Sequence, residues 1–191
     1  MRTFDELEAL WSAAPPAPRE AGTVRGLCVR HPDGIHEAPE AVHITVEDGV
    51  VGDRWAHNWR ARDPERTAQV TLINATIADL VGAGRQPLET AGDNLIVDFD
   101  ISEAHLPAGA RLRVGEVVLE VSHVPHTGCS KFAGRFGQDA LRWVNWRHWR
   151  ERRLRGVNTR VVSGGTVRVG DRVERLRLPV PAGAEEVPEP G

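Results

Sequence analysis

The segment HVPHTGCSKFAGRFG, residues 123–137, gathers more chemically useful side chains than any other stretch of this chain. Cys129 follows an apolar run and stands in a loop, where functional side chains are often placed. His126, Lys131 and Arg135 are nearby sources of positive potential, which lowers a thiol pKa and raises the thiolate fraction. A thiolate acts as a nucleophile, a persulfide carrier or a soft metal ligand. The alternative is a small buried residue, as free cysteines usually are.

Lys131 is the only lysine in a chain that otherwise uses arginine for its fixed positive charges. A lysine ammonium is a compact charge on a flexible stem, whereas an arginine is a planar fork. One interpretation is that the compact cation fits beside a thiolate or an anionic ligand where the fork would not. The other is that Lys131 points into water.

The spacing His-x-x-His-x-x-Cys, formed by His123, His126 and Cys129, also resembles part of a zinc site. Structural zinc needs four ligands, commonly as spaced pairs, and no second pair is present. We interpret His123 as a hydrogen-bonded histidine on a strand and His126 as a residue that lines a site. Cys28 lies in the middle of an expected strand, which favours burial.

Two polar segments are further candidates for ligand binding. Asp93 and Asn94 precede an apolar strand in ETAGDNLIVDFD, where they either cap a loop through their own backbone or contact a ligand. The segment VVGDRWAHNWRARD, residues 50–63, includes Arg54 and His57 and could hold an anion through arginine forks.

Three tryptophans at positions 143, 146 and 149 share one drifting face of an expected helix and predict packing against the barrel. The arginines of the same segment, at positions 142, 147, 150, 152, 153 and 155, form either a solvated face or an anion-binding patch. The formal net charge of −3 argues against a nucleic-acid partner. No apolar run approaches a membrane span, no signal peptide is recognised, and two cysteines fit a reduced cytoplasmic protein.

Short apolar alternations separated by turns predict a mainly β, barrel-like domain with a few helices. The expected organisation is an N-terminal helix and proline-rich linker over 1–22, a β-domain over 23–178, and a disordered tail over 179–191. Helices are predicted over 3–12, 74–82 and 134–153. A hairpin is predicted to close at Val114-Gly115-Glu116. The predicted strands are 23–30, 41–49, 68–73, 94–99, 110–115, 117–124, 159–165 and 171–178.

Several elements in a fixed order resemble the MOSC domain, the C-terminal domain of molybdenum cofactor sulfurases that also occurs as stand-alone proteins. The resemblance covers about residues 23–176. It rests on GDNL where the family usually has GENL, on Cys-x-Lys-Phe followed by RFG, then on RGV and a late VRVGD. One departure is AHNWRARDPERTAQVTL, where many stand-alone members carry a His-Gly-Gly type loop.

The resemblance implies a barrel similar to that of pyruvate kinase and a molybdenum–molybdopterin cofactor with Cys129 as the metal ligand. It implies that Asp93 and Asn94 lie near the metal or substrate. The residues expected to face the cofactor's negative charge are His126, Lys131, Arg135, Arg54 and His57. A pyridoxal-phosphate function would have to come from a partner domain.

Three functions remain open at this point. The first is a molybdenum-dependent reductase of small N-hydroxylated molecules that takes electrons from a donor protein. The second is a sulfur or cofactor carrier that uses a Cys129 persulfide, supplied by a cysteine desulfurase. The third is a non-catalytic anion-binding module built on the Trp/Arg segment.

Overall fold

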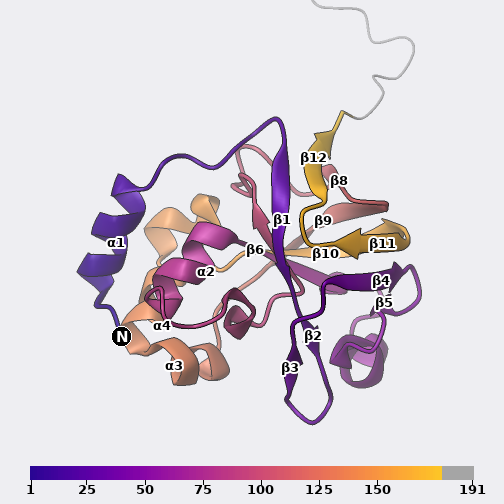
Figure 1. Ribbon diagram of the computed structural model, residues 1–191, viewed down its shortest axis with the longest axis horizontal. Coiled ribbons are helices and arrows are strands. Elements are labelled where there is room, and N and C mark those ends of the chain that lie inside the picture. The colour runs from indigo at the N-terminus through magenta and orange to yellow at the C-terminus, as the bar shows by residue number, and fades with distance from the viewer. Residues whose placement is uncertain (178–191) are drawn as a thin grey trace, which may run out of the picture.

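Seven strands close into a barrel in the computed structural model, which describes residues 1–177 (Figure 1). All neighbouring strands are antiparallel except β6 and β7, which are parallel and joined through helix α2. Around the barrel the strands are β1 (Gly22–Leu27), β12 (Arg172–Leu176), β8 (Arg111–Val114), β9 (Val117–Pro125), β10 (Val157–Ser163), β6 (Val70–Asn74) and β7 (Leu95–Asp98). The expectation of a mainly β, barrel-like fold with a few helices is therefore confirmed.

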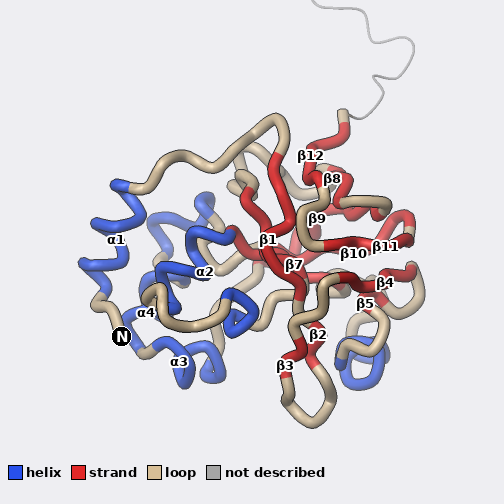
Figure 2. The backbone as a smooth tube through the Cα atoms, viewed as in Figure 1, coloured by secondary structure: helices blue, strands red, loops and turns tan. Residues whose placement is uncertain are grey.

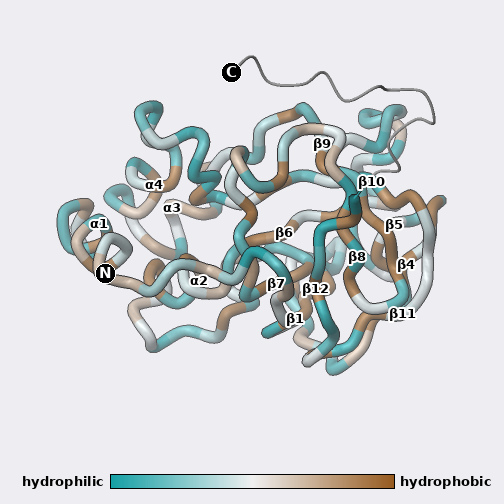
Figure 3. Tube along the Cα trace, turned by 90° about the horizontal axis from the view of Figure 1, so that it is seen from above, coloured by the Kyte–Doolittle hydropathy of each residue, from teal (hydrophilic) through white to brown (hydrophobic). Residues whose placement is uncertain are grey.

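The barrel interior is filled by aliphatic side chains that alternate along the strands. In β8, Leu112 and Val114 are fully buried while Arg113 faces solvent, as the period of two in a strand requires. The β8–β9 hairpin pairs Val114 with Val117, and Gly115 takes a positive φ of 55° in its turn, where the hairpin was predicted. Figure 3 shows hydrophobic residues along β6 of the barrel.

Two small sheets extend the barrel at one side (Figure 2). One contains β11 (Gly165–Arg168), β4 (Ala41–Thr45) and β5 (Gly49–Val50), and the other pairs β2 (Val29–Arg30) with β3 (His36–Glu37). The predicted strands 23–30 and 41–49 are thus each divided in two. Cys28 separates β1 from β2, and its N–H donates to the carbonyl of Asn94 just before β7.

Four α-helices form a second hydrophobic layer on the other side of the barrel (Figures 1 and 2). They are α1 (Phe4–Ala13), α2 (Ala75–Gly82), α3 (Ser130–Phe136) and α4 (Gln138–Val144). A capping box between Thr3 and Glu6 starts α1, and its Leu7 is fully buried. Glu8 accepts hydrogen bonds from Trp143 Nε1 and Arg152 Nη1, both at 3.0 Å, which ties α1 to α4 and the turn after it.

Short helical turns connect these elements. The described residues contain the π-helical turn η1 (Trp55–Trp59) and the 3₁₀ turns η2 (Arg60–Arg62), η3 (Leu88–Ala91) and η4 (Arg147–Arg152). No helix among residues 1–177 combines the length and apolar character needed to cross a bilayer. The tail expected over 179–191 lies outside the described residues.

The single helix predicted over 134–153 is wrong. Gly137 has a φ of 94°, which ends α3 and starts α4, and α4 stops at Asn145 before η4 begins. The expected packing of its tryptophans on the barrel stays a prediction, and the cluster that buries Trp143 also contains Ile73 of β6 and Ile96 of β7. Trp143 is buried in the helical layer, where its ring meets Trp11, whereas Trp146 and Trp149 contact Phe4.

Candidate functional site

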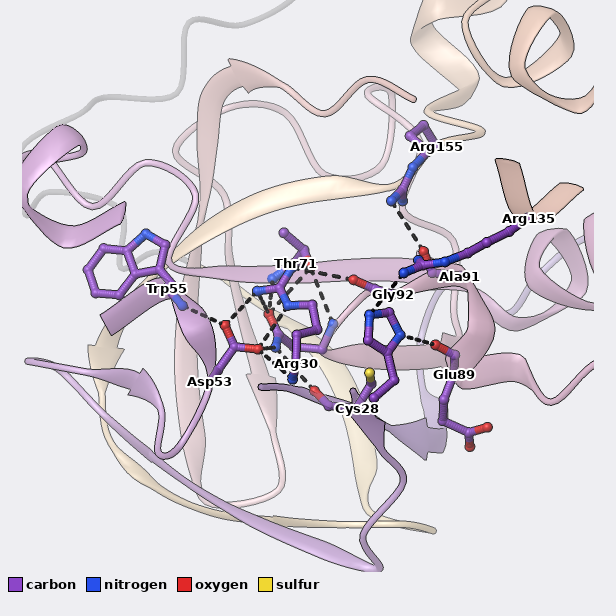
Figure 4. Close-up of polar contacts among 12 residues, drawn as sticks. Cys28, Arg30, Asp53, Trp55, Thr71, Glu89, Ala91, Gly92, Arg135 and Arg155 are labelled. Carbon is purple, nitrogen blue, oxygen red and sulfur yellow. Dashed lines mark hydrogen bonds and ion pairs between the residues drawn. The ribbon is translucent and has the colours of Figure 1, made fainter. Parts of the chain in front are cut away.

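A fully buried polar network lies beneath the loop that leads into β7 (Figure 4). Arg30 of β2 grips Asp53 with two hydrogen bonds, from Nε to Oδ2 at 2.8 Å and from Nη2 to Oδ1 at 2.9 Å. Asn94 Nδ2 donates to Asp53 Oδ2 at 2.9 Å, and its Oδ1 accepts from Arg30 Nη2 and the Thr71 N–H. Burial opposes ionisation of Asp53, but the Arg30 guanidinium outweighs it and holds the carboxyl pKa below its ordinary value.

This network fixes the backbone of the Gly92-Asp93-Asn94 loop. Arg30 Nη1 donates to the Gly92 carbonyl at 3.3 Å. The side-chain amide of Asn94 forms hydrogen bonds with protein groups through both its oxygen and its nitrogen. Asn94 was expected near the metal or substrate; its side chain is fully enclosed, and it positions the loop. Contact between Asn94 and a ligand therefore stays a prediction. The buried surroundings of its side chain do not support it.

A second cluster covers the same loop from the side of α3. Arg135 donates from Nη1 to the Thr90 carbonyl at 3.2 Å, and its Nη2 lies 3.1 Å from His36 Nε2. Burial and the Arg135 charge lower the pKa of His36, which fits a neutral ring accepting from that guanidinium. Gly92 has a φ of 78°, and a Cβ there would lie 2.8 Å from Arg135 Nη1, so only glycine lets the guanidinium approach.

Asp93 forms the buried centre of the site. Its Oδ2 accepts from Arg155 Nη1 at 2.6 Å, and its Oδ1 lies 3.4 Å from His126 Nδ1. Burial raises the pKa of Asp93 even though Arg155 opposes the shift, and burial with the Arg155 charge holds the pKa of His126 well below its ordinary value. Three enclosed atoms here lack a hydrogen-bond partner among the described residues: Asp93 Oδ1, His126 Nδ1 and Arg155 Nε.

Cys129 is exposed at the start of α3, as its place in a loop predicted. Partial burial opposes its ionisation. The backbone N–H groups of Phe132 and Lys131 and the charges of Arg155 and Arg135 outweigh that effect and lower the thiol pKa. By contrast, burial raises the pKa of Cys28 to about 12, in agreement with its interpretation as a buried residue.

The site is strongly cationic. Arg30, Arg54, Arg135 and Arg155 all influence its titratable groups, and the carboxylates that balance them are Asp53 and Asp93. Burial and the Arg30 charge lower the pKa of half-buried Arg54, while the charge of the Cys129 thiolate acts to raise it. Neither Arg54 nor Arg135 forms an ion pair within residues 1–177. Their charges are free to hold an anion beside the thiol.

The structure brings together some predicted site residues and leaves others outside. Cys129, Asp93, His126, Arg54 and Arg135 surround one region. For two exposed residues, no contact among the described residues supports the predicted role. Lys131 and His57 form no side-chain hydrogen bond or ion pair within the part of the chain described.

Four of the groups that shape the site were not predicted as site residues from the sequence. Arg30 is a charged residue at the end of an apolar strand, and Asp53 lies in the segment 50–63, from which only Arg54 and His57 were singled out. No sequence pattern indicated a role for His36, because it lies in β3, a two-residue strand that was not predicted. Arg155 was interpreted only as part of the basic stretch of arginines, and it also stands in the RGV segment that supported the family resemblance.

No arrangement of three or more His, Cys, Asp or Glu side chains suited to a metal ion occurs among residues 1–177. His123 is exposed, and only His126 of the zinc-like spacing reaches Asp93. A metal bound here would need most of its ligands from another molecule, with Cys129 as the protein's thiolate.

Comparison with known proteins supports one family. The model of the MOSC domain matches residues 65–174, more than half of the chain. Among solved structures, YuaD of Bacillus subtilis is 18% identical, with a TM-score of 0.56 over 83% of this chain and 97% of that one. YiiM of Geobacillus stearothermophilus is 14% identical, with a TM-score of 0.56 over 84% of this chain and 78% of that one. YiiM of Escherichia coli is 17% identical, with a TM-score of 0.51 over 81% and 70%. At these identities the likeness shows the fold, and no curated protein matches the chain.

Proposed function

This chain belongs to the MOSC domain family, and we propose that it binds a molybdenum–molybdopterin cofactor with Cys129 as a thiolate ligand of the metal. The observation that carries the proposal is an exposed thiol of lowered pKa beside Arg54 and Arg135, two cations without carboxylate partners in the described chain. A thiolate suits a soft metal, and free guanidinium groups suit the phosphate of a pterin cofactor.

The residues around Cys129 fit such a group. Asp93 Oδ1 and Arg155 Nε are enclosed and lack partners in residues 1–177, although buried polar atoms are normally paired. A polar ligand or ordered water at this point would satisfy them. The glycine at position 92 keeps the backbone open where a side chain would displace Arg135.

When bound, the cofactor would supply the two-electron chemistry that reduces a small N-hydroxylated molecule, with electrons from a donor protein. The chain's own groups then have distinct tasks. Cys129 holds the metal, Arg54 and Arg135 hold the negative charge, and the Arg30–Asp53–Asn94 network keeps the loop rigid. Asp93, whose pKa is raised by burial, can keep a proton on its carboxyl at a higher pH than an exposed aspartate.

A second candidate is a sulfur carrier in which Cys129 holds a persulfide received from a cysteine desulfurase. The observation in its favour is the same exposed thiol, because a persulfide must be reached by a donor and an acceptor protein. The free state of both cysteines fits a reducing compartment, and we propose a cytoplasmic location.

Metal and pterin content separates these candidates. The wild type, Cys129→Ser and Cys28→Ala are expressed in a host that makes molybdenum cofactor, and molybdenum, released pterin and sulfane sulfur are measured per chain. We expect near-stoichiometric molybdenum and pterin in the wild type and in Cys28→Ala, and a large loss of molybdenum in Cys129→Ser.

Sulfane sulfur on Cys129 without molybdenum would favour the carrier. Absence of molybdenum and pterin from all three proteins would refute the cofactor proposal. Purified protein that contains the cofactor is then assayed with N-hydroxylated substrates and a chemical electron donor. Turnover that is lost in Cys129→Ser would support the reductase.

A further inference from the structure

A groove of about 310 Å³ is lined by His126 and Arg155, the two residues that contact Asp93, and Cys129 is not among the residues that line it. It lies between the end of β9, the start of β10, and the turn η4. Its volume is at the lower end of what small-ligand sites occupy. The groove adjoins the cationic region around Cys129, because His126 and Arg155 contribute to both, but Cys129, Arg54 and Arg135 do not line it.

One wall of the groove is aromatic. Trp146 lines the groove and is 40% exposed as a whole, and it packs edge-on against Phe4 with 5.3 Å between ring centroids. Trp149 stacks on Phe4 with 5.7 Å between ring centroids, lies 6.3 Å from Trp146 and also lines the groove. These contacts hold Trp146 in place while leaving part of its ring uncovered, so a planar group could stack on it at little entropic cost.

The rim of the groove carries uncompensated positive charge. Arg147 and Arg150 of η4 are exposed, line the groove and form no ion pair within residues 1–177. Arg153 also lines it, where burial lowers its pKa and Glu103, the acidic residue in the lining, opposes that shift. The remaining cation, Arg155, is neutralised by Asp93. The balance of charge therefore favours an anion.

The inner end of the groove offers a hydrogen-bonding group. His126 Nδ1 is enclosed and faces Asp93 Oδ1, while the side chain as a whole is 14% exposed. The other ring nitrogen, Nε2, is neither enclosed nor paired with a described residue, so it is the nitrogen that faces the groove. Burial and Arg155 keep the ring neutral at pH 7, which makes Nε2 able to accept or donate according to tautomer.

We propose that this groove is a binding site for a planar aromatic anion, such as an aryl carboxylate. The ring stacks on Trp146, the anionic group pairs with Arg147 and Arg150, and a polar atom on the ring reaches His126 Nε2. The site needs neither the cofactor nor Cys129, so it stands apart from the proposed metal chemistry. A neutral molecule of the same shape binds more weakly, because the arginines then gain no partner.

The test uses 2-naphthoate as the probe, with 2-naphthamide as a neutral molecule of the same shape and inorganic phosphate as an anion without a ring. Binding to the full chain is measured by isothermal titration calorimetry. We expect saturable binding of naphthoate and at least a fivefold weaker affinity for the amide and for phosphate. Arg147→Gln and Arg150→Gln should each raise the Kd about two- to fivefold.

Trp146→Leu should raise the Kd for naphthoate about two- to tenfold. Trp59→Leu and Arg113→Gln are the matched controls, because both positions are exposed and lie outside the groove; their Kd should not change. Circular dichroism establishes that each variant is folded.

Absence of saturable naphthoate binding to the wild type would overturn the proposal. So would equal Kd values for the wild type, Arg150→Gln and Trp146→Leu. A third contrary result is loss of binding in Arg135→Gln with no change in Arg150→Gln, because the anion would then lie beside Cys129. Cys129→Ser should bind naphthoate as the wild type does whether or not the cofactor proposal holds, so the two proposals fail separately.

Discussion

Removal of one partner from the buried Arg30–Asp53 pair should destabilise the whole domain. Asp53→Ala would leave the Arg30 guanidinium enclosed without its carboxylate and would remove the acceptor of Asn94 Nδ2 and of the Trp55 N–H. Arg30 is 8% exposed and Asp53 is fully buried, so water cannot replace the lost contacts. Breaking such a buried pair costs about 3–5 kcal/mol.

That cost is a large share of the roughly 5–15 kcal/mol by which a domain is stable. For a chain of this size, about 2–4 °C of Tm is lost per kcal/mol. The expected fall is therefore about 6–20 °C. Urea unfolding followed by tryptophan fluorescence gives the free energy, and differential scanning calorimetry gives Tm.

Two comparisons make the prediction specific. Asp139→Ala breaks an exposed pair with Arg142 and should change the free energy of unfolding by less than about 1 kcal/mol. The double variant Arg30→Met/Asp53→Ala should be more stable than Asp53→Ala alone, since it removes the uncompensated charge. A loss below about 1 kcal/mol in Asp53→Ala would refute the assigned role of the network.

The same pair gives a pH dependence of known sign. The Asp53 pKa is lower in the folded protein than its ordinary value of 3.8. Its contribution is therefore complete above that value and is lost as the pH falls through the lower pKa of the folded state. The difference in stability between wild type and Asp53→Ala should shrink over that acidic range and stay constant near neutral pH.

Three further predictions concern the site and the helical layer. Cys129 should react with iodoacetamide at pH 7 faster than an unperturbed thiol, and Cys28 should stay unmodified in the folded protein, as mass spectrometry of peptides can show; equal rates would contradict the lowered pKa of Cys129. Gly92→Ala should lower the free energy of unfolding by about 1–3 kcal/mol in urea titrations, because it strains a φ of 78° and displaces Arg135; an unchanged midpoint would contradict the close approach. Glu8→Gln should cost about 1 kcal/mol by the same assay, because it weakens the contacts that join α1 to α4; no loss would show that α1 is held by apolar packing alone.

The sequence by itself determined the elements whose signals are local. A strand shows a period of two and a tight hairpin needs a residue at positive φ, so β8, β9 and the turn at Gly115 could be predicted. The thiol in the β9–α3 loop could be recognised because strand ends place functional side chains in loops. The ordered motifs likewise indicated the MOSC family before the fold was known.

The break in the predicted helix shows where local signals end. The helical spacing of the tryptophans runs from 143 to 149, but α4 ends at its C-cap, Asn145, and the chain continues as the separate turn η4. Packing against Phe4, which is more than 130 positions earlier in the sequence, decided the final positions of Trp146 and Trp149. Periodicity within one segment holds no information about such a partner.

Only the tertiary structure decided which charges meet. Arg30 and Asp53 are 23 positions apart, and Arg155 and Asp93 are 62 apart, so nothing in the spacing of either pair indicates a contact. Closure of the barrel and its β2–β3 extension buries these side chains together, and burial in turn sets their protonation. Composition can show that a chain has the groups for chemistry; their distances and exposure to water, which fix pKa values and binding, come from the fold.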